Sequence, residues 1–393
     1  MRILFWMSVS FDTHTTSEHL LTAILERLCE AGHAVHILQK DMGGPLPPVP
    51  PSLNAYPVTT ERVSFQAPEK GNLRARYLLE LRYLRECAKR VRSGYDAVFV
   101  QSTPAAWYAM EIARKKFPNA AITFNPQDIF PYNALYTGKM REGVVFNLLS
   151  AAQRRAYRQA DHIITISEDM KELLTEDGVE PDKISVVYNW SYRDEPYREN
   201  ELDYAPVAGM FDRRRFNVVY AGNIGVVQNV GLLIEAARLM RDDENTRFHI
   251  IGNGVRRREV EEAAKRYGLS NVSFRDMQPP EYAPLIYSSA DVNVITLEKN
   301  LYRTALPSKT ATCFACQKPA ILALGRESAF ARKMEREAGC LVIDSDKPEE
   351  LVAAIRTAQN NPRQRTGEAF TRYFSKSKNS QAYADIITGG RKA

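Results

Sequence analysis

The sequence of 393 residues lacks features that mark several large classes of protein. Every apolar run is shorter than the roughly 18 residues that a membrane-spanning helix needs, so no such helix is expected. The consensus patterns of serine hydrolases, zinc proteases, P-loop NTPases and EF-hand calcium sensors are missing, which leaves those classes without support. The turn at residues 7–12 has no GxGxxG, which argues against a dehydrogenase that binds a dinucleotide there.

Cysteine is scarce as well. The five cysteines are scattered among predicted helices and strands, and this usage fits reduced thiols in the cytoplasm. Residues 1–6 resemble the start of a buried strand more than a signal peptide, which favours the same compartment. Cys313 and Cys316 form a CxxC, but no second pair or nearby histidine completes a tetrahedral metal site. We therefore interpret them as the apolar face of a helix.

The chain has no strong excess of charge of one sign. With 53 basic and 47 acidic residues its net charge is +6, too little to indicate a nucleic-acid partner without a basic motif. Residues 73–92 are the local exception, since arginines surround apolar residues that recur every three or four positions. Such a helix could touch the inner membrane surface peripherally, or its apolar stripe could face the domain core. We prefer the second interpretation.

Short apolar segments alternate with amphipathic ones along both halves, a pattern typical of parallel sheets covered by helices. We predict an α/β protein with two doubly wound parallel sheets. The expected strands are residues 2–6, 34–38, 97–100, 121–124, 162–166 and 184–187, then 217–221, 248–251, 272–274, 292–297, 320–323 and 340–343. Expected domains are 1–200 and 201–369, with a helical tail, 370–393, that packs on the first domain. The proline-rich stretch 43–57 should be a surface loop.

Two strand, glycine-loop and helix units lie close together in the second half, at residues 217–237 and 248–267. Their loops are Gly222-Asn223-Ile224-Gly225 and Gly252-Asn253-Gly254, and Leu306-Pro307-Ser308-Lys309 enters a further helix. Helix N-termini attract anions, and ligands of such sheets bind beyond the carboxyl ends of the strands. One glycine after a strand often only closes a turn. Two such units and a lysine together predict a nucleotide diphosphate site.

Several stretches, taken together, resemble the family-4 glycosyltransferases. They are residues 1–4, 30–35, 160–168, 222–225, 251–254 and 306–309, and the likeness is greatest to the branch that builds cell-surface polysaccharides, marked also by residues 127–131. The resemblance implies the GT-B architecture, in which two Rossmann-like domains face a cleft. It also implies retaining transfer of a sugar from a nucleotide sugar, with no metal and no cofactor.

The chain departs from the common family pattern at three places. Asn223 and Gln228 replace a basic pair that would hold the diphosphate, and Thr304 and Thr312 replace two glutamates. Residues 12–16 replace a pair of glycines near the first helix. We interpret these differences as traits of a subfamily.

Lys309 is the first catalytic candidate, because a departing diphosphate needs positive charge beside it. The expected base-binding segment is residues 275–278, and Arg256 is expected to contact phosphate. The predicted donor-binding residues are Gly222, Asn223, Gly225, Gln228, Gly252, Gly254, Arg256, Met277, Leu306, Pro307, Ser308 and Thr312.

The first domain is expected to bind the acceptor. Asp128 follows a predicted strand directly, where α/β proteins place working side chains, so it is the second catalytic candidate. It could equally be a turn residue that caps the next segment. His14, Thr15 and Gln127 are the predicted acceptor-binding residues.

We expect transfer of a hexose or an N-acetylhexosamine from UDP to a lipid-linked or saccharide acceptor. A nucleotide-sugar epimerase of the same shape is an alternative, but it would need an acid and a base around the donor sugar. A non-catalytic donor-binding partner of another transferase is a further alternative, suggested by the replaced basic pair and glutamates.

Overall fold

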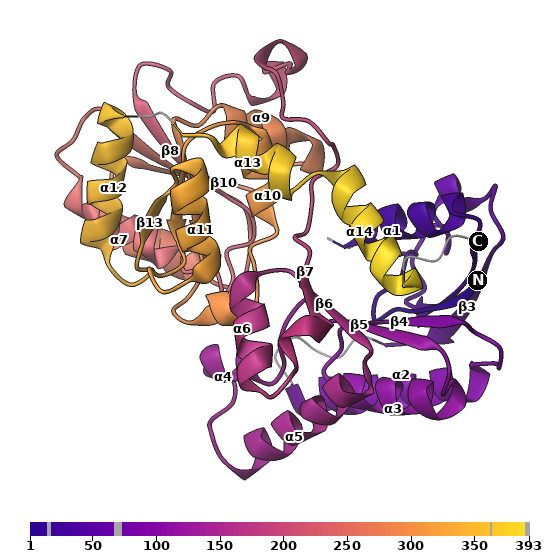
Figure 1. Ribbon diagram of the computed structural model, residues 1–393. Coiled ribbons are helices and arrows are strands. Elements are labelled where there is room, and N and C mark those ends of the chain that lie inside the picture. The colour runs from indigo at the N-terminus through magenta and orange to yellow at the C-terminus, as the bar shows by residue number, and fades with distance from the viewer. Residues whose placement is uncertain (14–16, 67–72, 362–363, 390–393) are drawn as a thin grey trace. The chain divides into compact units, whose positions relative to one another are not determined.

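The computed structural model describes residues 1–13, 17–66, 73–361 and 364–389 (Figure 1). The chain forms two compact units. The N-terminal unit comprises Met1–Tyr188 with Lys376–Ala393, and the C-terminal unit comprises Asn189–Ser375. The units thus divide at residue 188, whereas the sequence placed the boundary at residue 200. None of the described helices is long and apolar enough to cross a membrane.

Seven parallel strands form the sheet of the N-terminal unit, in the order β3-β2-β1-β4-β5-β6-β7. They are β1 Arg2–Trp6, β2 Ala34–Asp41, β3 Val58–Ser64, β4 Ala97–Gln101, β5 Ala121–Asn125, β6 His162–Thr165 and β7 Ile184–Val186. The predicted doubly wound sheet is confirmed, but the sequence analysis missed β3. This strand lies at the edge and is mostly polar and half-exposed, so it lacks the apolar run by which the other strands were recognised.

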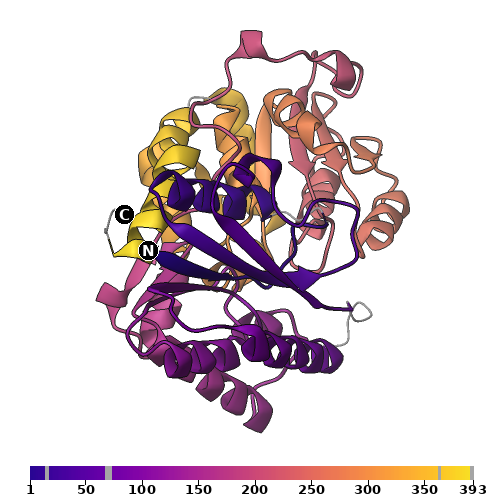
Figure 2. The same cartoon turned by 90° about the vertical axis from the view of Figure 1, so that its right-hand side faces the viewer.

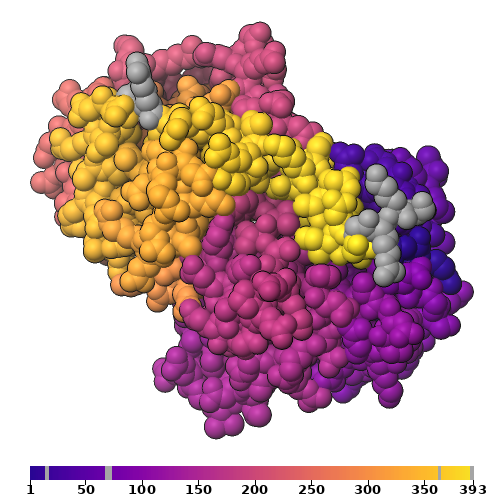
Figure 3. Space-filling model, viewed as in Figure 1, coloured from indigo at the N-terminus to yellow at the C-terminus, as the bar shows by residue number. Residues whose placement is uncertain are grey.

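Helices cover both faces of this sheet. Helices α1 (Glu18–Glu30) and α14 (Lys376–Thr388) pack together on one face, and α2 (Leu73–Arg90), α3 (Ala106–Lys116) and α5 (Val144–Gln159) lie on the other (Figures 1 and 2). The space-filling view shows α14 in yellow on the surface of the unit, beside the indigo N-terminal segment (Figure 3). Shorter helices are α4 (Tyr132–Tyr136), α6 (Glu168–Glu176), η1 (Pro51–Leu53) and η2 (Pro181–Lys183).

The arginine-rich helix α2 has a buried side and an exposed side. Tyr83, Leu84, Cys87 and Ala88 are buried, so the apolar stripe faces the core as preferred from the sequence. The arginines Arg74, Arg76, Arg82 and Arg85 are exposed.

Six parallel strands form the sheet of the C-terminal unit, in the order β10-β9-β8-β11-β12-β13. They are β8 Phe216–Ala221, β9 Thr246–Ile251, β10 Val272–Arg275, β11 Val292–Thr296, β12 Ala320–Ala323 and β13 Leu341–Ile343. From β8 the chain builds outward to β10, and from β11 outward to β13, so the strand order reverses between β8 and β11. Ligands of open α/β sheets bind beyond the carboxyl ends of the strands at such a point.

Helices also pack against the sheet of the C-terminal unit. On one face, α7 (Gly231–Leu239), α8 (Arg257–Arg266) and α12 (Pro348–Asn360) enclose an apolar core with the strands. The remaining elements are η3 Glu199–Glu201, η4 Ala205–Val207, η5 Pro280–Tyr282, α9 Ala283–Ser288, η6 Leu301–Arg303, α10 Lys309–Ala315, α11 Ala329–Ala338 and α13 Thr366–Tyr373. Cys313 and Cys316 are buried and unbridged, as predicted.

Candidate active site

The glycine loop after β8 and the start of α10 meet at the point where the strand order reverses. Tyr220 is the next to last residue of β8, and Gly222 follows the strand directly. Lys309 is the first residue of α10. The Lys309 ammonium nitrogen, Nζ, lies 3.6 Å from the centre of the Tyr220 ring. It is also only 3.0 Å from the position that a Cβ atom on Gly222 would occupy. The absent side chain of Gly222 therefore leaves room for the ammonium group.

The Lys309 ammonium group is buried, and none of the residues that the structure describes supplies a counter-ion to it. Among the described residues no hydrogen-bond acceptor reaches its Nζ atom, although an ammonium group carries three donors. The Tyr220 ring supplies the main favourable contact, through a cation–π interaction. Burial lowers the pKa of Lys309 to about 7, and Cys313 opposes that shift weakly. A buried cation of this kind favours an anion as its partner.

Backbone hydrogen bonds join the two glycine loops. The amide of Gly222 donates to the Ile251 carbonyl at 2.8 Å, and the amide of Ile224 donates to the Asn253 carbonyl at 2.8 Å. A Cβ atom on Gly252 would lie 1.8 Å from the Gly222 oxygen, and one on Gly254 would lie 2.3 Å from the Ile224 oxygen. Contact between the loops therefore requires glycine at 252 and at 254. The role predicted for them, close approach of a donor, remains a prediction.

Neutral side chains close the first glycine loop. The Gln228 Oε1 atom accepts hydrogen bonds from the Gly225 amide at 3.1 Å and from the Asn223 side chain at 3.2 Å. The Tyr220 hydroxyl donates to the Asn223 carbonyl at 2.6 Å. Asn223 and Gln228 thus stabilise the loop where the family pattern places two cations. The sequence analysis missed Tyr220, although its position at the end of a strand before a glycine loop was a usable signal.

The three arginines after Gly254 differ in their contacts. Arg256 forms an ion pair with Glu298 at 3.0 Å, and Arg257 donates to the carbonyls of Gly252 and Arg275. Arg258 is 90% exposed and pairs with Glu262. Arg257 therefore fixes the second loop from within. The sequence analysis also failed to name Glu298, which lies two residues after β11. Its acidic side chain just after a buried strand was the signal that could have identified it.

The other predicted donor residues surround the same edge of the sheet. Met277 is 52% exposed in the loop after β10, where the base was expected. The Pro307 carbonyl accepts hydrogen bonds from the Thr310 amide at 3.0 Å and from its hydroxyl at 2.7 Å, which orders the first turn of α10. Leu306 is partly buried and Ser308 is exposed. Thr312 lies one turn beyond Lys309 on the same side of the helix.

The predicted acceptor residues belong to the N-terminal unit. Asp128 follows β5, and its backbone carbonyl accepts a hydrogen bond from Ser102. The residue as a whole is exposed, but the atoms around its carboxyl group desolvate that group and raise its pKa to about 6, against the opposing charge of Arg76. The Gln127 amide donates to Asn125 at 2.9 Å and lies 3.5 Å from the hydroxyl of Tyr383 on α14. Gln127 therefore helps to hold the C-terminal helix. His14 and Thr15 lie outside the described residues.

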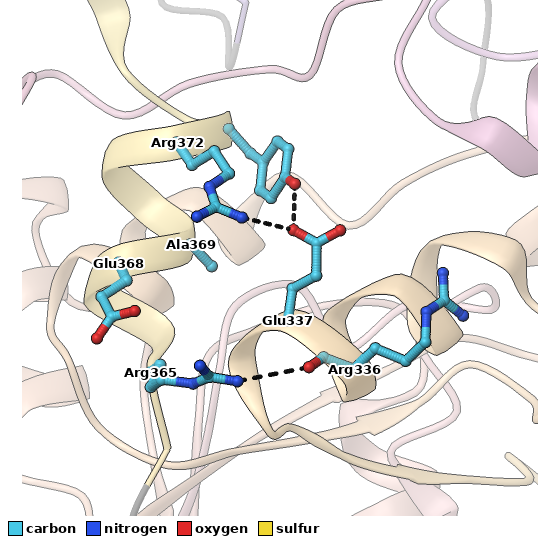
Figure 4. A pocket seen from close by; sticks show the side chains of 7 residues that line it. Arg336, Glu337, Arg365, Glu368, Ala369 and Arg372 are labelled. Carbon is cyan, nitrogen blue, oxygen red and sulfur yellow. Dashed lines mark hydrogen bonds and ion pairs between the residues drawn. The ribbon is translucent and has the colours of Figure 1, made fainter.

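A hollow of about 220 Å³ lies between α11 and α13, and none of the predicted donor residues lines it (Figure 4). The Glu337 carboxylate there accepts hydrogen bonds from Arg372 at 3.1 Å and from the Tyr373 hydroxyl. Arg365 reaches the backbone carbonyl of Arg336 at 3.5 Å. These contacts join the two helices, so the hollow has a structural explanation. Across the described ranges, no three acidic, histidine or cysteine side chains gather as a metal site would require.

Comparison with known proteins gives two family matches. Residues 17–190 match the model "Glycosyl transferase 4-like domain", and residues 215–361 match "Glycosyl transferases group 1". One relative, the putative colanic acid biosynthesis glycosyl transferase WcaI of Escherichia coli K12, is 28% identical over 58% of this chain and 57% of its own length. The probable glycosyltransferase WbjE of Pseudomonas aeruginosa is 25% identical over 54% and 53%. The chain thus aligns with little more than half of each of these relatives.

Solved structures of low sequence identity share the fold. Anabaena HepE in complex with UDP and glucose is 14% identical, with a TM-score of 0.62 over 99% of this chain and 95% of its own. The predicted GT-B architecture, in the sense of two parallel-sheet α/β domains, is thereby confirmed. The chain thus carries a glycosyl transferase 4-like domain followed by a glycosyl transferases group 1 domain.

Proposed function

We propose that the protein transfers a sugar from a UDP-sugar to an acceptor, with retention of the anomeric configuration and without a metal ion. One observation carries the proposal. The ammonium group of Lys309 is buried against Tyr220 and Gly222 without an acceptor among the described residues, at the edge of the sheet where ligands bind. A diphosphate oxygen is the partner that this group lacks.

The geometry suits stabilisation of a departing diphosphate. Negative charge develops on that group as the bond between sugar and phosphate breaks, and a cation already fixed in place need not reorganise. Lys309 is held by its position at the start of α10 and by the Tyr220 ring. In a buried site its charge acts through a low dielectric, which strengthens the interaction. Lys309 is therefore our proposed catalytic residue, and Asp128 our proposed acceptor-side residue.

The relatives support a role in making surface polysaccharides. WcaI is described as a putative colanic acid biosynthesis glycosyl transferase, and HepE was crystallised with UDP and glucose. For this chain we propose a hexose or an N-acetylhexosamine as the transferred sugar, and a lipid-linked or saccharide acceptor. Exposed Met277 and Val255, in the loops after β10 and β9, offer apolar surface to the uracil base.

Thermal-shift measurements with UDP-, GDP- and dTDP-sugars test the donor. We expect UDP and UDP-sugars to raise the melting temperature most, because a ligand that binds only the folded state stabilises it. A larger shift from GDP- or dTDP-sugars would contradict the choice of UDP. Slow hydrolysis of the bound UDP-sugar without acceptor would support a transferase, and binding without any hydrolysis or transfer would support the non-catalytic alternative.

UDP binding should take up a proton. Without ligand the pKa of Lys309 is about 7, and a bound diphosphate should raise it toward the ordinary value. Above pH 7 the free ammonium loses its proton and the bound one keeps it, so affinity should fall up to about tenfold per pH unit. Calorimetry at pH 8.5 in buffers of different ionisation enthalpy should give an uptake near one proton. An uptake of zero, or an affinity independent of pH from 6 to 9, would contradict this assignment.

A further inference from the structure

Three large aliphatic side chains are exposed together at the start of α5. Val144 is 76% exposed, Val145 is 62% exposed and Leu148 is 66% exposed. Val144 and Leu148 are four residues apart and share one side of the helix, next to Val145. We call these three residues the apolar turn. Clustered exposed aliphatics are unusual on a soluble surface, whereas single ones are not.

The apolar turn is not needed for folding of the N-terminal unit. The other side of α5, which includes Phe146, Ala156 and Tyr157, is the buried side, and the helix packs on α3. Helix α5 leads into β6, so its first turn lies at the carboxyl edge of the sheet, where Asp128 follows β5. The exposed aliphatics therefore occupy the edge of the unit at which we propose the acceptor to bind.

Basic side chains are exposed just before the apolar turn and elsewhere on the same face of the sheet. Lys139 and Arg141 are exposed directly before the apolar turn, and neither has an ion-pair partner among the described residues. Helix α2, on the same face of the sheet as α5 (Figures 1 and 2), adds the exposed arginines and the 65% exposed Leu78. Acidic residues of this face and of the neighbouring α6 offset part of this charge: Glu86 pairs with Lys89, Glu111 with Arg155 and Asp177 with Arg154, while Glu142, Glu172 and Glu176 are exposed.

We propose that the apolar turn and its basic surroundings dock the protein peripherally on an anionic lipid bilayer. Aliphatic side chains can enter the headgroup region while nearby lysines and arginines contact lipid phosphates. Lys139 and Arg141 beside the aliphatics, with the exposed arginines of α2 on the same face, favour a negatively charged surface, and a bilayer offers both the apolar region and the phosphates. Docking at this face would bring a lipid-linked acceptor to Asp128. This delivery of the acceptor rests on the proposed function, whereas the binding to the membrane is independent of it.

Co-sedimentation of the full chain with vesicles tests the docking. We expect binding to vesicles of phosphatidylcholine mixed with phosphatidylglycerol and little binding to phosphatidylcholine alone, with a loss at high salt. The triple variant Val144→Ser, Val145→Ser, Leu148→Ser should lower the partition coefficient at least tenfold. Lys139→Gln with Arg141→Gln should weaken binding to the anionic vesicles several-fold. The matched control is Leu239→Ser, which removes a 43% exposed leucine of α7 and should leave binding unchanged.

Other occupants of the face give distinct results. Because the three substituted side chains are exposed, the triple variant should keep the melting temperature and the UDP affinity of the wild type. A loss of vesicle binding can then not be ascribed to unfolding. The proposal is overturned if the wild-type chain ignores anionic vesicles, or if the triple variant binds them equally well. It is also overturned if the wild-type chain is a dimer and the triple variant a monomer, because the face would then join two copies.

Discussion

Replacing Lys309 by methionine should lower sugar transfer about 100- to 1,000-fold, the usual effect of removing one fixed group that stabilises developing negative charge. UDP affinity should fall as well, because the same ammonium group meets the diphosphate in the ground state. Methionine fills a similar volume and keeps the contact with the Tyr220 ring. Rates of transfer and UDP titrations of the two proteins measure both effects.

The same substitution should stabilise the protein without ligand. Folding lowers the pKa of Lys309 from 10.5 to about 7, so the folded state disfavours the charged form. Below pH 7 both states are charged and the destabilisation is fully present. It shrinks as the pH rises from 7 to 10.5 and vanishes above that range. At pH 7 the destabilisation is on the order of a few kcal/mol, which the methionine variant should recover as a higher melting temperature.

The control for Lys309 is the exposed Lys265 of α8, whose replacement by methionine should change neither rate nor stability. Comparing the Lys309 variant with the wild type at pH 7 and at pH 10 checks the electrostatic cause, since the gain in stability should be smaller at pH 10. If the Lys309 variant instead loses activity together with a comparable loss of stability, seen as a lower melting temperature, Lys309 is a structural residue and the proposed mechanism is wrong.

Gly252→Ala should impair folding more than any other single substitution in the glycine loops. The new Cβ atom would lie 1.8 Å from the Gly222 oxygen, and Gly252 has a φ of +149°, which other residues rarely adopt. The obstructing atom belongs to the backbone of a loop held by hydrogen bonds on both sides, so it cannot move away freely. We expect a loss of about 3 kcal/mol or more in the free energy of unfolding, or roughly 6 to 12 °C in melting temperature.

Two glycine controls separate the causes of that loss. Gly178 has a φ of +87° with no atom within 4 Å of its Cβ position, so Gly178→Ala reports the backbone penalty alone. At Gly222 the new Cβ would meet the flexible end of Lys309 at 3.0 Å, so Gly222→Ala should displace the ammonium and weaken UDP binding more than Gly178→Ala does. Chemical denaturation compares the three variants. If the Gly252→Ala variant is as stable as the Gly178→Ala variant, the contact between the loops is not the reason that position 252 requires glycine.

Much of the fold was predictable because it depends on local patterns. The alternation of apolar strands with amphipathic helices predicted twelve of the thirteen strands found in the described residues, several with matching ends, such as Arg2–Trp6 and Ala320–Ala323. The strand that was missed, β3, is an edge strand whose polar residues leave no apolar signal. Lys309 could be named from its Leu-Pro-Ser-Lys context, and the structure places it at the reversal of strand order.

The sequence by itself determined the two parallel sheets and the glycine loops after β8 and β9, since periodicity and turn chemistry act between near neighbours, and it made Lys309 a candidate. Only the tertiary structure decided what each of these residues contacts. Tyr220 lies 89 positions before Lys309 (309 − 220), and Glu298 lies 42 positions after Arg256, and each pair meets only because parallel strands bring distant loops to one edge. The pKa of Lys309 depends on burial, and the exposure of the apolar turn depends on which side of α5 packs inward. Both are properties of packing, which no short stretch of sequence contains.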